Sequence, residues 1–182
     1  MSLKASATLI FVFSLCVVSA KPQDSIPSEP YNVAEAYKIY SLLLQHEPSY
    51  PFGKDTVMIR QEALVASTPC LTTPAEKKFA DAVVALNRLQ RKRWLLQPRF
   101  QIDRPYKLIG PEVIKTLPSR PESVTASYVE MSTVGFNRDK TRALVFMGKS
   151  CGGLCGHWTY HLLEKVQGKW KEVPGVNCSI AS

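Results

Sequence analysis

Two cysteines near the C-terminus are the residues whose type and spacing could do chemistry. Cys151 and Cys155 flank the short segment Gly152-Gly153-Leu154, and Gly156 and His157 follow directly. Neighbouring thiols can form a stable disulfide, exchange with another disulfide, or bind a metal ion together with a histidine. The segment therefore allows a structural disulfide, a thiol-redox site, or a metal site that uses both cysteines and His157.

The spacing of the two cysteines favours the structural disulfide. Thiol-redox enzymes place a Cys-x-x-Cys pair at a helix N-terminus, where the helix dipole lowers the thiol pKa. Here the spacing is Cys-x-x-x-Cys, and the alternating apolar residues on both sides predict a turn between two strands. A redox or metal-binding protein centred on the Cys151–Cys155 turn is kept as the alternative interpretation.

The N-terminus predicts a secretory signal peptide within residues 1–20. Lys4 supplies the positive charge, residues 9–18 the apolar stretch, and Val18-Ser19-Ala20 the small-residue cleavage pattern. The apolar stretch is too short for a permanent membrane-spanning helix. We therefore expect cleavage after Ala20, a secreted or periplasmic protein, and a mature chain without a transmembrane segment.

Export would place the remaining cysteines in an oxidising compartment. Removal of Cys16 with the signal leaves four cysteines, an even number that favours disulfides. Four cysteines permit three pairings. We prefer Cys151–Cys155 with Cys70–Cys178, because the glycine-rich turn can bring the near pair into bonding range.

Length and charge limit the classes of partner. Removing the signal from 182 residues leaves 162, about one domain, and removing Lys4 lowers the formal net charge from +8 to +7. A basic surface favours anionic partners, and an exported protein seldom meets nucleic acid. We therefore expect an anionic surface or a small ligand as partner, with no nucleic acid. The run Arg88-Leu89-Gln90-Arg91-Lys92-Arg93-Trp94 is the candidate contact for such a surface, and the alternative is a solvated helix end whose Trp94 packs inward.

Two helices are predicted in the N-terminal half. The first has a capping-box pattern, Asn32 with Glu35, and apolar residues at helical spacing up to Pro48. The second opens with Thr73 at the N-cap and Pro74 at the first helical position. Short strands are predicted at residues 57–61, 100–102 and 106–109.

The C-terminal half predicts an antiparallel meander. Its strands are expected at residues 128–136, 141–148, 157–166 and 170–173, joined by short turns. The fold class is therefore α+β: two N-terminal helices packed on a C-terminal antiparallel sheet, in the manner of cystatin-like or nuclear-transport-factor-like cones. Residues 21–30 are expected to be a flexible tail, and residues 31–182 a single domain.

Several C-terminal motifs resemble one group of proteins. These motifs are Val134-Gly135-Phe136-Asn137, the Cys-Gly-Gly-Leu-Cys-Gly turn at 151–156, and Gly168-Lys169-Trp170. Over residues 132–182 they resemble a C-terminal hairpin module of small exported bacterial proteins of unknown function. The resemblance implies export and a globular α+β domain, and it carries over no catalytic residues. An aromatic residue is usual in that group where this chain has Cys178, which supports a pairing with Cys70 particular to this chain.

These observations predict a binding function. Cone-shaped folds place a pocket between helix and sheet, so Tyr37, Tyr40, Trp158 and Tyr160 are expected near one ligand pocket. No catalytic residue and no cofactor is expected. The prediction is an exported, disulfide-stabilised, non-catalytic binding module.

Overall fold

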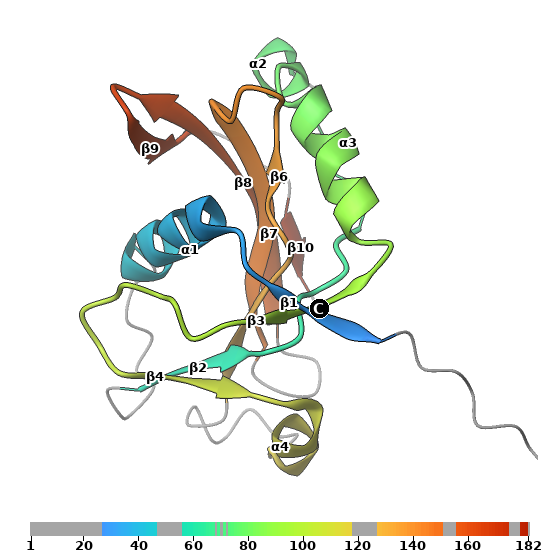
Figure 1. The fold of residues 1–182 in the computed structure, drawn as a ribbon, viewed down its shortest axis with the longest axis vertical. Helices are drawn as coiled ribbons and strands as arrows, with labels where there is room; N and C mark the ends of the chain where they lie inside the picture. Colours follow the sequence, from blue (N-terminus) through green and yellow to red (C-terminus); the bar gives the residue numbers. More distant parts are fainter. Residues whose placement is uncertain are drawn as a thin grey trace, which may run out of the picture.

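The computed structural model describes residues 27–46, 56–67, 69, 71, 73–117, 127–150, 156–174 and 179–181. It is a mixed α/β structure built on a mostly antiparallel sheet (Figure 1). The predicted signal peptide and all five cysteines lie outside the described residues. The predicted cleavage after Ala20 and the predicted disulfides also fall there.

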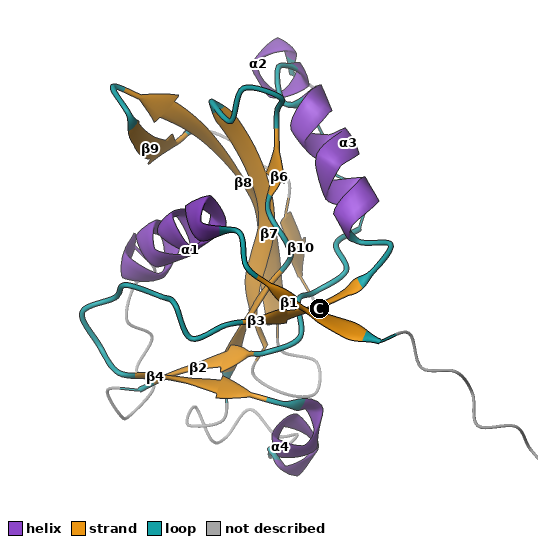
Figure 2. Cartoon of the chain, viewed as in Figure 1, coloured by secondary structure: helices purple, strands orange, loops and turns teal. Residues whose placement is uncertain are grey.

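The main sheet has the spatial order β10–β8–β7–β5–β2–β4, shown in orange in Figure 2. Its antiparallel part consists of β10 (Ser179–Ala181), β8 (Gly156–Val166), β7 (Arg142–Ser150) and β5 (Tyr128–Met131). Its parallel part adds β2 (Val57–Arg60) and β4 (Tyr106–Ile109) beyond β5. Short strands β6 (Gly135–Phe136) and β9 (Lys169–Glu172) extend β7 and β8. A separate parallel pair joins β1 (Ser28–Tyr31) to β3 (Arg93–Leu96).

The helices begin close to where the sequence predicts them. The first, α1 (Ala34–His46), begins two residues after Asn32, and the Glu35 carboxylate accepts hydrogen bonds from Lys165 and Trp170. The second keeps the predicted capping box at Thr73. The predicted second helix is divided in two: α2 (Pro74–Lys77) ends after one turn, and a separate helix α3 (Ala80–Leu89) follows. A further helix, α4 (Pro111–Thr116), follows β4.

The core consists of two apolar clusters on opposite faces of β7. Ala143, Val145 and Met147 pack in the cluster that contains α1. Leu144 and Phe146 pack in the cluster that contains α3. Because successive side chains of a strand point to opposite faces, α1 and α3 cover the two sides of the sheet, as Figure 1 shows. This explains why β7 is a continuous apolar run rather than an alternating one.

The predicted architecture is correct only in outline. The sheet is not confined to the C-terminal half, because β2 and β4 join it in parallel to β5. Residues 28–30, expected in the flexible tail, belong to β1. The physical reason is the same in both places. These four-residue strands are held by partners more than forty positions away in the chain, which local periodicity cannot reveal.

Two smaller strand predictions also change. The strand predicted at residues 106–109 is confirmed as β4, whereas residues 100–102 form no strand, and Phe100 is buried in the core between strands. The strand predicted at 128–136 is interrupted at residues 132–134. There the Ser132 hydroxyl accepts the Phe146 backbone N–H and donates to the Thr133 carbonyl. The side chain thus replaces part of the strand ladder, and β5 and β6 become separate strands.

Candidate functional site

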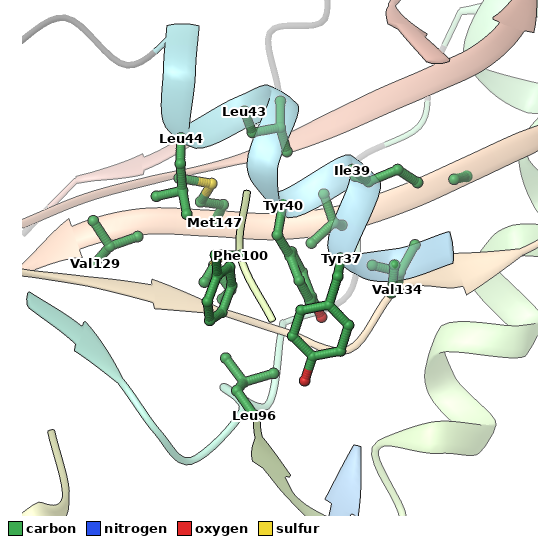
Figure 3. Packing of buried hydrophobic residues seen from close by; sticks show 14 of the residues in the cluster. Tyr37, Ile39, Tyr40, Leu43, Leu44, Leu96, Phe100, Val129, Val134 and Met147 are labelled. Carbon is green, nitrogen blue, oxygen red and sulfur yellow. The ribbon is translucent and has the colours of Figure 1, made fainter. Parts of the chain in front are cut away.

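The four residues predicted to line one pocket lie in two different places. Tyr37 and Tyr40 project from α1 into the first cluster, where Figure 3 shows them beside Phe100. Tyr160 belongs to the second cluster, and Trp158 packs against it. The sheet separates the two pairs, so the structure does not bring the four side chains together.

The tyrosines of α1 use their hydroxyl groups to hold the backbone. The Tyr40 hydroxyl donates to the Ser132 carbonyl at 2.7 Å. The Tyr37 hydroxyl donates to the Tyr31 carbonyl at 2.8 Å and accepts the Gln97 N–H at 2.7 Å. Burial raises the pKa of both phenols, so both stay protonated at neutral pH. Their geometry indicates a structural role in fixing irregular segments against the helix.

A row of polar residues crosses the opposite face of the sheet. The strand register places Arg60 beside Glu130, Glu130 opposite Gly148, and Gly148 opposite Trp158. We call these four residues the Trp158 row. The apolar neighbours of the row along β2, β5 and β7 pack under α1, and Trp158 itself packs against the α3 cluster, so the row lies on the face that α3 covers farther along the strands.

A buried carboxylate is the centre of the Trp158 row. Glu130 is only 4% exposed, and its two oxygens have different partners. Oε1 accepts a hydrogen bond from the Arg60 guanidinium at 2.7 Å, and Oε2 accepts the Trp158 indole N–H at 3.0 Å. A buried carboxylate needs such partners, because an unpaired charge in this position would cost several kcal/mol. The row is therefore a fixed arrangement in which the carboxylate orients both the indole and the guanidinium.

Two glycines make room for the indole. A Cβ on Gly148 or on Gly156 would lie closer than 3.0 Å to atoms of the Trp158 ring. Gly148 faces the pyrrole side of the ring, and Gly156 faces the benzene side. The last glycine of the Cys-Gly-Gly-Leu-Cys-Gly motif thus has a packing reason: it lets the indole lie flat on the β7–β8 ladder.

The charges continue beyond the row. Glu62 accepts a hydrogen bond from Arg93 at 2.7 Å and lies 3.8 Å from the Arg60 guanidinium. The charges thus alternate in sign from Arg93 through Glu62 and Arg60 to Glu130. This network joins β3, β2 and β5, which are distant in sequence.

Sequence reasoning found Trp158 but missed Arg60 and Glu130. One signal was present: Glu130 is the charged residue within the apolar run of β5, between Val129 and Met131. No sequence signal placed Arg60 beside it, because the parallel pairing of β2 with β5 joins residues seventy positions apart.

The basic run predicted to contact an anionic surface is partly neutralised. Lys92 pairs with Glu29 at 2.7 Å, and Arg93 pairs with Glu62 at 2.7 Å. Trp94 is partly buried and packs against the first cluster. These three side chains therefore have structural partners within the protein.

The histidine proposed as a metal ligand lies away from the Trp158 row. His157 is exposed, and strand alternation directs it to the opposite face from Trp158. His161, on the same side as His157, has its Nδ1 at 2.5 Å from a carboxylate oxygen of Glu172. Among the residues that the structure describes, no group of three or more His, Cys, Asp or Glu side chains could hold a metal ion. Cys151 and Cys155 lie outside those residues.

Comparison with known proteins finds no relative. No family model, curated protein or solved structure matches this chain.

In the described part of the chain, no helix has the length and apolar character needed to cross a membrane.

Proposed function

We propose that this protein is an exported, disulfide-stabilised binding module that holds a small ligand on the Trp158 row without catalysing a reaction. The observation that supports it is the arrangement around Glu130. A buried carboxylate fixes an indole and a guanidinium that are both only partly buried. Side chains preorganised in this way can bind a ligand without a large entropy cost.

The residues beside the Trp158 row indicate which kind of ligand it would bind. On the same face, one step along the strands, lie Lys107, Met58, Tyr128, Ser150 and Gly156. Arg60 is 30% exposed, and the guanidinium has five N–H donors, more than Glu130 uses. We infer a ligand with a flat ring or apolar part against Trp158 and an acidic group at Arg60.

A titration with 8-anilinonaphthalene-1-sulfonate tests this site, because the dye combines aromatic rings with an anionic group. We expect saturable binding that is about tenfold weaker in Arg60→Gln/Glu130→Gln, which removes a charge-assisted contact. Trp158→Leu should weaken binding as well. The double variant leaves no buried charge unpaired, so that it still folds.

The matched control is Arg142→Gln/Glu164→Gln. This pair also joins neighbouring strands, its side chains are more exposed, and it lies at the other end of β7 and β8. It should bind the dye as the wild type does. Equal dye binding by the wild type, Trp158→Leu and Arg60→Gln/Glu130→Gln would show that the Trp158 row is not the binding site.

The strand register supports the Cys151–Cys155 disulfide. Ser150 and Gly156 are the last described pair of the β7–β8 ladder. Five residues connect these paired positions, with the two cysteines at their ends. The predicted strand-to-strand setting is thus found on both sides of the turn, which favours the structural disulfide over a helix-terminal redox site.

The surroundings of the other two cysteines support a Cys70–Cys178 disulfide. The Tyr160 hydroxyl donates to the carbonyl of Ser67, three residues before Cys70. Ser179, which follows Cys178, pairs with Thr159 of β8. The flank of each cysteine therefore contacts one of two adjacent residues of β8, Tyr160 on the Cys70 side and Thr159 on the Cys178 side, although the cysteines are more than a hundred positions apart in sequence.

Export and disulfides are tested together by mass spectrometry of protein expressed with its own N-terminus. We expect a mature chain that begins at Lys21, no thiol that alkylates before reduction, and four that alkylate after it. Non-reduced peptide mapping should find the pairs Cys151–Cys155 and Cys70–Cys178. Free thiols at Cys151 and Cys155, or a retained metal ion, would instead support the redox or metal-binding alternative.

We also propose that the C-terminal part of this chain shares a module with the proteins it resembles. The β7–β8–β9 hairpins cover the part of the chain that resembles the small exported bacterial proteins, which favours a common C-terminal module. A likeness to cystatin-like or nuclear-transport-factor-like cones stays a prediction. A solved structure of the disulfide-bonded protein, compared with such cones, would decide it.

A further inference from the structure

The outer side of α2 and α3 carries exposed cations that the ligand site does not use. Lys77 and Lys78 lie at its N-terminal end, and Arg88 and Arg91 at its C-terminal end, and all four are exposed. Within the described residues, none of the four forms an ion pair, in contrast to Lys92 and Arg93 of the same segment. We call these four cations the α3 basic face.

The acidic residues of this segment do not balance the charge. Glu76 is buried, and its carboxylate accepts the Thr73 backbone N–H in the capping box. Asp81 is the other carboxylate of the segment and is exposed. Four exposed cations therefore face solvent with one exposed carboxylate among them.

An exposed apolar residue lies between the two pairs of cations in the sequence. Val84 is 68% exposed, and its spacing from Asp81 and Arg88 places the three on one side of α3. The inner side of the helix, with Ala82 and Leu86, is fully buried against the sheet. The helix is thus anchored along its length and presents its outer side as a fixed surface.

We propose that the α3 basic face binds peripherally to a membrane surface rich in anionic phospholipids. Clustered lysine and arginine side chains are attracted to anionic headgroups, and the attraction falls off within a Debye length. The net charge of +8 has the complementary sign. The exposed valine between the cations favours a lipid surface over a purely ionic partner, because it can enter the boundary between headgroups and acyl chains. The inference does not depend on the ligand proposed for the Trp158 row.

Vesicle co-sedimentation of the folded, disulfide-bonded protein tests the proposal. The probes are vesicles of phosphatidylcholine alone and of phosphatidylcholine mixed with phosphatidylglycerol. We expect binding to the mixed vesicles only, and weaker binding as salt is raised. Each cation near the surface contributes about fivefold in affinity, so Arg88→Gln/Arg91→Gln should weaken binding by roughly 25-fold.

The matched control is Lys92→Gln/Arg93→Gln. It removes the same formal charge from the same segment, but its cations already pair with Glu29 and Glu62. We expect it to weaken vesicle binding clearly less than Arg88→Gln/Arg91→Gln does, because Lys92 and Arg93 are held by Glu29 and Glu62 and are not free to contact headgroups directly. Thermal unfolding of both variants checks that each is folded.

Three outcomes would overturn the inference. The first is equal binding to both kinds of vesicle. The second is an equal loss of vesicle binding in the two double variants, which would show that binding depends on the total charge and not on the α3 basic face. The third is retention on heparin beads without binding to mixed vesicles, which would assign the face to an anionic glycan.

Discussion

The ion pair between Arg60 and Glu130 offers the sharpest test of the site. Arg60→Leu removes the cation that hydrogen-bonds the Glu130 carboxylate at 2.7 Å. Among the residues that the structure describes, no other cation forms a hydrogen bond with this carboxylate. The Glu130 side chain is 6% exposed, so its charge cannot be rehydrated without opening the sheet. Trp158 remains as its hydrogen-bond donor, but an indole N–H does not neutralise a carboxylate.

The size of the effect follows from the burial of the two partners. Breaking a fully buried ion pair costs about 3–5 kcal/mol, because one charge is left uncompensated. Arg60 is 30% exposed, so water already replaces part of its contribution, and we expect about 2–3 kcal/mol. Adding Glu130→Gln removes the uncompensated charge and keeps an oxygen for the indole N–H. The double variant should therefore be only about 1 kcal/mol less stable than the wild type.

Urea unfolding at neutral pH, followed by tryptophan fluorescence, measures these differences. The control is Arg142→Leu, which breaks a pair with Glu164 whose partners are 38% and 39% exposed. It should cost less than about 1 kcal/mol. If Arg60→Leu costs no more than Arg142→Leu, or if Glu130→Gln fails to rescue it, the carboxylate is not held as a buried charge. The reasoning about the Trp158 row would then be refuted.

Three further substitutions test the packing, the buried tyrosine and the charged contacts of α1. Gly148→Ala should destabilise by about 1–3 kcal/mol, because the new methyl group overlaps the Trp158 ring; an unchanged urea midpoint would contradict this. Tyr40→Phe should cost about 1–2 kcal/mol in the same assay, because it leaves a buried backbone carbonyl without its donor, and a neutral result would mean that water replaces the hydroxyl. Hydrogen bonds from Lys165, Lys38 and Trp170, in that order of importance, lower the pKa of Glu35 from its ordinary 4.5 to about 2. Its stabilisation is therefore complete above pH 4.5 and is lost as the pH falls through 2. Glu35→Gln should destabilise by about 1 kcal/mol at neutral pH, a value reduced for solvent screening, and should flatten the acid side of a stability–pH curve; an unaltered curve would argue against the contact.

Local signals predicted the elements that neighbouring residues determine. The Thr73 capping box forms as expected, because all its donors and acceptors lie within four residues. The β8–β9 hairpin also forms as expected, and its turn places Gln167 and Gly168 at positive φ. The strand predicted at residues 141–148 forms as β7, and the structure adds that it is buried on both faces.

The pocket prediction failed for a reason that these same signals explain. Alternation along β8 correctly placed Trp158 and Tyr160 on one face, and helical spacing correctly placed Tyr37 and Tyr40 together. Neither pattern states which face of the sheet the helix covers. The structure puts α1 on the other face, so the two correct pairs do not meet.

The sequence by itself determined where α1 and α2 begin, the β8–β9 hairpin and the residues that share one face of each strand, because these depend on contacts within a few positions of the chain. Only the tertiary structure decided which strands are neighbours. The parallel pairing of β2 with β5 brings Arg60 to Glu130, and the β5–β7–β8 ladder brings Glu130 to Trp158. Such pairings are stabilised by burial and backbone hydrogen bonds between distant segments. No local pattern encodes them, and the candidate site therefore becomes visible only in the folded chain.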